Sequence, residues 1–333
     1  MKRTFLILVC LLQFACKSQY SGKIKGVSFV GSRERVTQEQ VNAVVDLNAD
    51  HAAIMPFGFI RNLNTPEIIF NTDRQWFGET TNGAKQYIRE LRNSGLKIML
   101  KPQIWIWRGE FTGDLAMKSE EDWKILEHSY QEFILTYVAL ANELKAEIFC
   151  IGTELDEFVQ QRPAFWKELI GKIKKQYNGK LTYAANWDEY PRVYFWPLLD
   201  YIGIDAYFPL SDEKTPTIAQ LKEGWQPWKE KILSMASSLE KPVLFTEFGY
   251  RSMDYTAKKP WLVDRADQNI NLAGQANAKT ALFEVFWNED WFAGGFVWKW
   301  FIHHNEVGGS NDNRFTPQNK PAEEVIKLFY HSY

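Results

Sequence analysis

The sequence predicts a single (β/α)8 barrel that occupies residues 22–333 of the 333-residue chain. Short apolar segments alternate with longer amphipathic ones, and no linker or low-complexity stretch divides them. Polar residues collect where the apolar segments end, which is the face on which barrel enzymes carry their sites. A doubly wound open sheet is the alternative, but the G-x-G-x-x-G turn that it calls for after an early strand is not found.

Eight segments are predicted as strands because each is short and apolar without long polar alternation, as in strands covered on both faces. They are 25–31, 51–57, 96–104, 146–154, 180–187, 201–208, 242–248 and 293–300. Helices are predicted at 38–48, 83–94, 119–145, 162–177, 216–239, 266–287 and 321–331. The longest helix opens with a cap signature at Ser119 and Asp122. Only the connection between the fifth and sixth strands lacks a full helix.

The composition restricts the class of partner. With 45% hydrophobic residues the chain can bury one large core, and we expect a monomer. A net charge of −2 indicates neither nucleic acid nor an anionic membrane as a partner. The fourteen tryptophans are unusual. Most are expected in the core, but the indole ring also stacks on the apolar faces of sugar rings.

Residues 1–16 are predicted to be an export signal rather than part of the fold. Lys2 and Arg3 precede an apolar stretch that is too short to span a bilayer, and Ala15 and Cys16 follow it. The segment resembles a bacterial lipoprotein signal, in which Cys16 is lipidated and becomes the N-terminus. An ordinary secretory signal is the alternative. We therefore expect an exported protein that meets a membrane only through its lipid anchor.

Cleavage of this signal leaves Cys150 as the only thiol within the fold, so no intramolecular disulfide and no cysteine-based metal site is expected. Histidine is scarce, and the adjacent pair His303 and His304 lacks the spacing of metal ligands. The sequence predicts neither a metal nor a cofactor.

Two of the predicted strands end in a glutamate. Glu154 ends the fourth strand and Glu247 the seventh, and these strands lie across the mouth of an eight-stranded barrel from each other. Two carboxylates that face each other are the groups that cleave a glycosidic bond. Because side chains alternate along a strand, Cys150 and Gly152 are expected to point inward with Glu154, which leaves room at the centre.

The same alternation selects further residues for the mouth of the barrel. A buried lysine is costly unless it meets a carboxylate or a substrate, so the face of the third strand that carries Lys101 is expected to point inward. The predicted mouth residues are Lys101, Gln103, Trp105, Trp107, Asp205, Tyr207, Phe296, Trp298 and Trp300. The mouth is therefore expected to be acidic at its centre and aromatic around its rim.

Structural roles are the alternative for each of these candidates. Glu154 and Glu247 can be a pair bridged by a basic residue, and Lys101 can pair with Asp205 and do nothing else. Trp298 can pack under the rim. The acidic residues of the loops, Asp156, Glu157, Asp188 and Glu189, are expected to be solvated charges.

Three segments resemble glycoside hydrolase family 113, the β-1,4-mannanases of clan A. They are 151–155 (Ile-Gly-Thr-Glu-Leu), 201–209 (Tyr-Ile-Gly-Ile-Asp-Ala-Tyr-Phe-Pro) and 246–252 (Thr-Glu-Phe-Gly-Tyr-Arg-Ser), the last followed by Pro260-Trp261. The resemblance covers almost all of 22–333 and implies Glu154 as acid/base and Glu247 as nucleophile. Thr153 stands where many clan members carry an asparagine that binds the sugar 2-hydroxyl, and Asn186 is the candidate to replace that contact.

The resemblance implies retaining hydrolysis of β-mannan or manno-oligosaccharides. Tyr207 and Lys101 are the expected donors to the nucleophile, and Trp298 and Trp105 the expected sugar platforms. Two alternatives stay open. One is a clan A hydrolase of another β-glycan, such as a glucan or glucomannan. The other is a glycan-binding lipoprotein without catalytic activity, which has no need of both glutamates.

Overall fold

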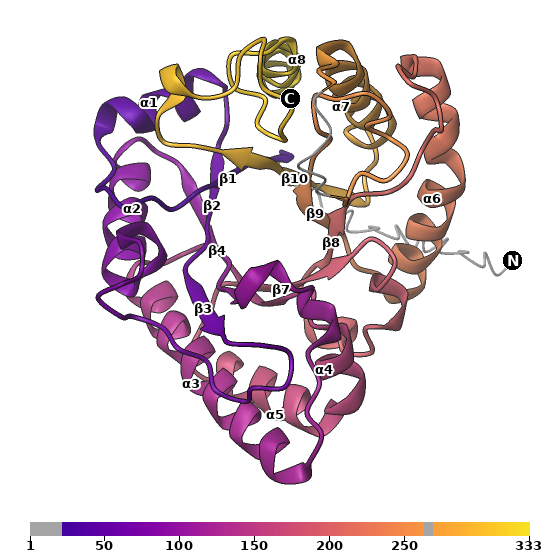
Figure 1. Ribbon diagram of the computed structural model, residues 1–333. Helices are drawn as coiled ribbons and strands as arrows, with labels where there is room; N and C mark the ends of the chain where they lie inside the picture. The colour runs from indigo at the N-terminus through magenta and orange to yellow at the C-terminus, as the bar shows by residue number, and fades with distance from the viewer. Residues whose placement is uncertain (1–21, 263–268) are drawn as a thin grey trace, which may run out of the picture.

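The computed structural model describes residues 22–262 and 269–333 and contains a closed barrel of eight parallel strands (Figure 1). In chain order the strands are β1 (Ile24–Phe29), β2 (His51–Ile54), β4 (Lys97–Leu100), β6 (Ile148–Thr153), β7 (Lys180–Asn186), β8 (Ile202–Ala206), β9 (Val243–Phe248) and β10 (Phe292–Trp300). Neighbours around the barrel follow the order β1-β10-β9-β8-β7-β6-β4-β2. The predicted (β/α)8 barrel is confirmed.

The helices form a ring around the strands, as Figure 1 shows. They are α1 (Gln38–Asp46), α2 (Thr81–Asn93), α3 (Glu120–Glu143), α4 (Asp156–Gln161), α5 (Pro163–Lys174), α6 (Ile218–Leu239), α7 (Leu272–Phe286) and α8 (Pro321–Ser332). The cap predicted for α3 is present, since Ser119 Oγ accepts the backbone N–H of Asp122 at 3.1 Å. The start predicted for α7, residues 266–268, lies outside the described residues. Only short 3-10 turns connect β7 to β8, as predicted.

Two predicted strands are each divided by a proline. The segment 51–57 becomes β2 and β3 (Phe57–Ile60) around Pro56, and 96–104 becomes β4 and β5 (Gln103–Ile106) around Pro102. Proline has no N–H to give to a strand ladder, so the ladder is interrupted there. β3 and β5 then pair with each other as a separate two-stranded sheet beyond the barrel strands. This sheet extends the wall of the barrel mouth next to β4.

The core has an inner and an outer part. Inside the barrel lies a small apolar cluster with residues from most strands, namely Ile24, Ala53, Met99, Ile148, Leu244, Ala293 and Phe296. The larger cluster lies between the strands and the helices and is rich in aromatic rings. The inner cluster closes the barrel below the polar residues at the strand ends. Apolar side chains therefore lie directly beneath the polar side chains at the strand ends.

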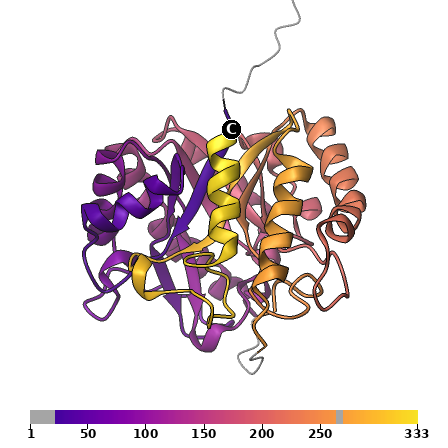
Figure 2. The ribbon, with the colours of Figure 1, turned by 90° about the horizontal axis from the view of Figure 1, so that it is seen from above.

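The site and the C-terminus lie at opposite ends of the barrel. The end of α8 lies beside the start of β1, because Tyr330 Oη donates to the carbonyl of Gly26 at 2.8 Å and Lys25 Nζ donates to the carbonyl of Tyr330 at 3.0 Å. Figure 2 shows the C-terminus at this end of the barrel. Within residues 22–262 and 269–333, no helix has the length and apolar character needed to cross a bilayer.

Candidate active site

Glu247 is a buried carboxylate that three side chains contact as donors. It lies on β9, and only 5% of its surface is exposed. Tyr207 Oη donates to Glu247 Oε2 at 2.7 Å, Gln103 Nε2 donates to Oε1 at 3.1 Å, and Lys101 Nζ also contacts Oε1. Donors of this kind stabilise the ionised form of a carboxyl group. The predicted contacts of Tyr207 and Lys101 with Glu247 are thus present.

Lys101 joins Glu247 to a second buried carboxylate, Asp205. Both Lys101 and Asp205 are fully buried, and Lys101 Nζ lies 3.3 Å from Asp205 Oδ2. Burial acts to lower the pKa of Lys101, but the charges of Asp205 and Glu247 raise it above its usual range. The lysine therefore remains a cation in the barrel. The alternative that Lys101 pairs with Asp205 and nothing else is wrong, because it contacts both acids.

Glu154 comes directly after β6 and is half-buried. Its backbone is left-handed, with φ of 50°, and its N–H donates to the carbonyl of Ala184 on β7 at 2.8 Å. Burial raises the pKa of Glu154 well above its usual range, and the charges of Asp205, Glu247 and Glu189 raise it further. These effects favour the protonated form of Glu154, and Glu247 is one of the charges that act on it.

The two glutamates thus have different environments. Glu247 is surrounded by donors, whereas Glu154 faces other acids and the apolar wall. A carboxylate beside a protonated carboxyl group is the division of roles that glycoside cleavage requires. On their barrel strands, the fourth and seventh in chain order, they are separated by β7 and β8.

The prediction that Gly152 points inward with Glu154 is wrong. A Cβ at Gly152 would lie 2.6 Å from Tyr130 Oη and 3.0 Å from the Trp166 ring, both in the outer core under α3 and α5. The cause is a register shift between Cys150 and Thr153, where β6 has an extra residue relative to β7. Strict alternation does not hold across such a bulge.

A similar shift corrects the prediction for β10. Phe296 belongs to the inner cluster as predicted, but Trp300 is fully buried in the outer core. The pairing of β10 with β1 shifts register after Val297, so the alternation changes there. Trp298 lies at the shift and is half-buried, and its peptide bond to Lys299 is cis. Trp298 is thus partly exposed, whereas Trp300 is buried.

Gly249 brings Trp298 close to the strand of Glu247. A Cβ at Gly249 would lie 2.6 Å from the Trp298 carbonyl oxygen, which is too close for any other residue. Lys299 Nζ lies 5.2 Å from the centre of the Trp298 ring, a cation–π contact. Burial lowers the pKa of Lys299, and the charge of Glu247 acts in the opposite direction. Trp298 and Lys299 are thus neighbours of Glu247.

The other aromatic candidates lie further out. Trp105 on β5 is 48% exposed and pairs with Phe59 of β3, and Trp107 is 66% exposed. Gln103, two residues before Trp105 on the same face of β5, contacts Glu247 at 3.1 Å. Trp105 therefore lies on the same face of the two-stranded sheet as Gln103, the residue that contacts Glu247.

Asn186 lies at the end of β7 beside Asp205, with which it is in register on β8. Its Oδ1 accepts the N–H of Trp187 at 2.9 Å. The Trp187 ring stacks on Trp261 at 4.9 Å between ring centres. Asn186 is half-buried, and its side-chain amide carries a donor group besides the Oδ1 acceptor.

Glu189 is not the solvated loop charge that the sequence predicts. It is 3% exposed, and its Oε2 accepts the N–H of Asn186 at 3.3 Å. Burial raises the pKa of Glu189 to about 8, and the charge of Asp156 adds to the effect. Thr246 and Glu189 are buried polar residues that the sequence did not assign to the site. Gln103 was predicted at the mouth because it alternates with Lys101, and it contacts Glu247.

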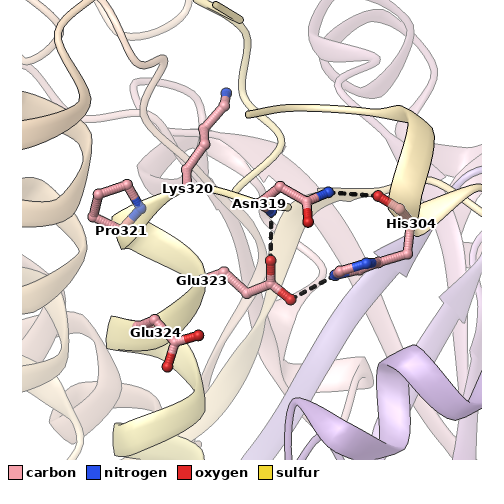
Figure 3. A pocket seen from close by; sticks show the side chains of 6 residues that line it. All are labelled: His304, Asn319, Lys320, Pro321, Glu323 and Glu324. Atoms are coloured by element: carbon pink, nitrogen blue, oxygen red, sulfur yellow. Dashed lines mark hydrogen bonds and ion pairs between the residues drawn. The ribbon is translucent and has the colours of Figure 1, made fainter. Parts of the chain in front are cut away.

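The loop after β10 closes one side of the site. Phe315 in this loop packs on the ring of Tyr207 at 5.9 Å between ring centres, and Tyr207 donates to Glu247. The loop is fastened to the start of α8, where His304 Nε2 lies 2.7 Å from Glu323 Oε1 (Figure 3). The hollow of about 600 Å³ drawn there is lined by His304, Asn319, Lys320, Pro321, Glu323 and Glu324 and contains neither glutamate of the site.

The described residues contain no metal-binding cluster. Within 22–262 and 269–333, no three His, Cys, Asp or Glu side chains are grouped so that they could hold a metal ion. Cys150 is a buried free thiol, and burial raises its pKa to about 12.

The barrel mouth brings together a carboxyl group held by donors and a second one whose pKa is raised, and these are the groups that a glycoside hydrolase uses. The model of Glycoside Hydrolase Family 113 matches residues 30–320. The chain therefore belongs to glycoside hydrolase family 113, as the three sequence segments indicated. No curated protein matches the chain at a significant level.

Solved structures agree with the fold. The family 113 β-mannanase from Alicyclobacillus acidocaldarius, in complex with ManMIm, superposes with a TM-score of 0.82 at 23% identity, covering 94% of this chain and 98% of that one. A family 113 β-1,4-mannanase complex gives 0.81 at 22% identity, covering 94% and 100%. A β-glucuronidase from Faecalibacterium prausnitzii gives 0.62 at 14% identity, covering 93% of this chain and 49% of that one.

Proposed function

We propose that this glycoside hydrolase is a retaining β-1,4-mannanase, with Glu247 as nucleophile and Glu154 as acid/base. The observation that carries the roles is the difference between the two carboxyl groups: Glu247 is contacted by Tyr207, Gln103 and Lys101, whereas burial and neighbouring acids raise the pKa of Glu154. The substrate class rests on family membership and on the two β-mannanases of similar fold.

The mechanism follows from these environments. Glu247 attacks the anomeric carbon while Glu154 gives its proton to the leaving oxygen, which yields an α-linked glycosyl-enzyme and a free sugar. Ester formation removes the charge of Glu247, one of the charges that raise the pKa of Glu154. Glu154, now ionised, takes a proton from water as the water attacks the same carbon from the opposite face, which breaks the ester bond and releases the Glu247 carboxylate. The product keeps the β configuration.

Three further residues are proposed to bind the substrate. Trp298 lies at the rim beside the strand of Glu247 and provides a flat apolar wall for the sugar at the cleaved bond. Trp105 is exposed two residues beyond Gln103 and provides a platform further along the chain of sugars. Asn186 offers the amide donor that Thr153 does not supply. Thr153 is half-buried, and its hydroxyl lacks a hydrogen-bond partner among the described residues.

Trp298→Ala is expected to lower kcat more than it raises KM. The distorted sugar of the transition state presses against this indole, so its removal weakens transition-state binding more than ground-state binding. An aromatic contact of this size corresponds to ~1–3 kcal/mol, or roughly a ten- to hundredfold loss in kcat/KM. Steady-state kinetics on manno-oligosaccharides measure it.

Trp298→Phe is the matched variant and should recover part of the loss. Trp300→Phe is a control, because Trp300 is buried in the outer core away from the mouth. If Trp298→Ala has normal kinetics and only a lower melting temperature, Trp298 packs under the rim and the platform must be sought at Trp105.

Hydrolysis of a panel of polysaccharides tests the substrate class. We expect turnover of β-1,4-mannan, with slower or no turnover of β-1,4-glucan and xylan. Proton NMR of the first product should show the β anomer before mutarotation, since the proposed mechanism retains configuration. Faster turnover of a glucan than of any mannan would replace the substrate assignment, and no turnover of any glycan would support a binding protein instead.

We also propose that the protein is exported and anchored through a lipid on Cys16, which lies outside the described residues. The basic, apolar and small residues of positions 1–16 support this proposal. The full-length protein expressed in a bacterial host should partition with membranes, and Cys16→Ser should release it or block its processing. N-terminal analysis of the mature chain checks the site. If the mature chain begins at any other residue, the protein is exported without a lipid on Cys16.

A further inference from the structure

Asp205 is a third carboxylate in the site and has no role in the proposed mechanism. It lies on β8, is fully buried, and is next to Glu247 in the register of β8 with β9. Lys101 Nζ lies 3.4 Å from its Oδ1 and 3.3 Å from its Oδ2. Thr246 Oγ1 donates to Oδ1 at 2.7 Å. Asp205 is thus held on one side by a hydroxyl and on the other by the lysine that contacts Glu247.

One cation lies between two buried carboxyl groups. Lys101 contacts both Asp205 and Glu247, so a single positive charge serves both acids. Burial, followed by the charge of Glu247, raises the pKa of Asp205 to about 7, while Lys101 opposes the rise. The titratable and charged groups that interact with Asp205 or Glu154 from the surrounding elements include Lys101, Cys150, Glu189, Tyr207 and Glu247. Lys299 interacts with Glu247.

We propose that Asp205 is a positioning residue of this active site: it anchors Lys101 against Glu247 and contributes negative charge beside Glu154. An ammonium group with a single carboxylate partner can rotate on its flexible stem. Shared between two carboxylates, the ammonium of Lys101 has one position, and in that position it contacts Glu247 Oε1.

The role follows from the change of charge during the reaction. When Glu247 becomes an ester, Lys101 loses that anionic partner but keeps Asp205. Without Asp205, Lys101 would be a buried cation without a carboxylate, which is strongly unfavourable. It would also face a sugar that acquires positive charge in the transition state, and like charges repel. Asp205 therefore favours both the intermediate and the transition state that leads to it.

The test is Asp205→Asn in the full-length protein, with the pH dependence of kcat/KM measured on manno-oligosaccharides. Asparagine keeps the size and the acceptor for Thr246 but removes the charge. We expect a roughly ten- to hundredfold lower kcat/KM. The alkaline limb should also move to lower pH by about one unit, because a negative charge that raises the pKa of Glu154 is gone. Asp200→Asn is the matched control: Asp200 lies at the other end of the barrel, where it accepts from Lys180 and Leu181.

A double-mutant cycle with Lys101→Met tests whether Asp205 acts through the lysine. In the Lys101→Met background the added Asp205→Asn should cost less than threefold in kcat/KM, while the shift of the alkaline limb persists. If Asp205→Asn alone does not fold, that shift is measured between Lys101→Met and the double variant, in which the buried charges are removed together. An unmoved limb, or additive losses in the cycle, would overturn the proposal.

The role of Asp205 rests on the proposed function for its catalytic glutamates, but its failure can be distinguished from a failure of that proposed function. If the wild-type protein cleaves a β-glycan other than mannan, the same pH profiles are measured on that glycan, and only the substrate assignment has failed. If mannan is cleaved and the Asp205→Asn profile is unchanged, the role of Asp205 has failed and the proposed function stands.

Discussion

Glu247→Ala is expected to lower kcat/KM on β-mannan by roughly 10⁴-fold or more, because no glycosyl-enzyme can form without the nucleophile. The fold should persist. Lys101 keeps its pairing with Asp205, and Tyr207 and Gln103 reach a cavity that water can enter from the mouth. Thermal unfolding checks the fold, and initial rates on mannan check the activity. Glu223→Ala, an exposed glutamate on α6, is the control and should retain full activity.

Azide is expected to rescue Glu247→Ala with inversion. The anion is small enough to occupy the space of the missing carboxylate, where Lys101, Tyr207 and Gln103 remain as donors. It then attacks the anomeric carbon from the nucleophile's face, and the product is an α-glycosyl azide. NMR of the product assigns the anomer. A β-glycosyl azide from this variant would mean that Glu154, and not Glu247, is the nucleophile.

Glu154→Ala is expected to lower kcat/KM on mannan by about 10²–10⁴-fold, the usual contribution of a general acid. The sugar leaving group of mannan is a poor one and needs the proton. On an aryl mannoside with an acidic phenol the first step needs no proton, so the loss should be far smaller there. The second step, which needs a base, becomes slow and a burst of phenol is expected. Glu157→Ala, an exposed glutamate on α4, is the control.

Azide should rescue Glu154→Ala on the aryl mannoside and give the β anomer. The glycosyl-enzyme is still formed on Glu247, and azide attacks it from the face that Glu154 has vacated, without needing a base. The two rescue experiments therefore give opposite anomers. Equal and substantial activity on mannan in both variants would leave the pair without a catalytic role, as structural carboxylates bridged by Lys101.

The strand positions of the candidate site could be predicted from the sequence. Glu154 and Glu247 end short apolar runs, and the regular alternation of strands and helices numbers those runs as the fourth and seventh. Alternation along the third strand also put Lys101 and Gln103 on one face, and both contact Glu247. Local patterns such as these depend on residues near one another in the chain, so the sequence reports them directly.

The alternation of side chains along a strand gave the wrong orientation wherever the strand was irregular. The register shifts in β6 and β10 turn Gly152 and Trp300 to the outer core, and no residue in either run marks the shift. Pro56 and Pro102 were visible signals for the division into β3 and β5, because a proline cannot continue a ladder. A bulge in contrast arises from how two strands twist together, which involves segments far apart in sequence.

By itself, the sequence determined the barrel and the strand ends that carry acids, because hydrophobic periodicity is a local property. Only the tertiary structure decided which acids share a buried space. Asp205, Glu247 and Lys101 belong to three separate segments of the chain. Glu189 lies in a loop whose charges the sequence predicts to be solvated, yet it is buried. The charges that raise the pKa of Glu154 depend on distances between these segments, and those distances exist only once the barrel has closed.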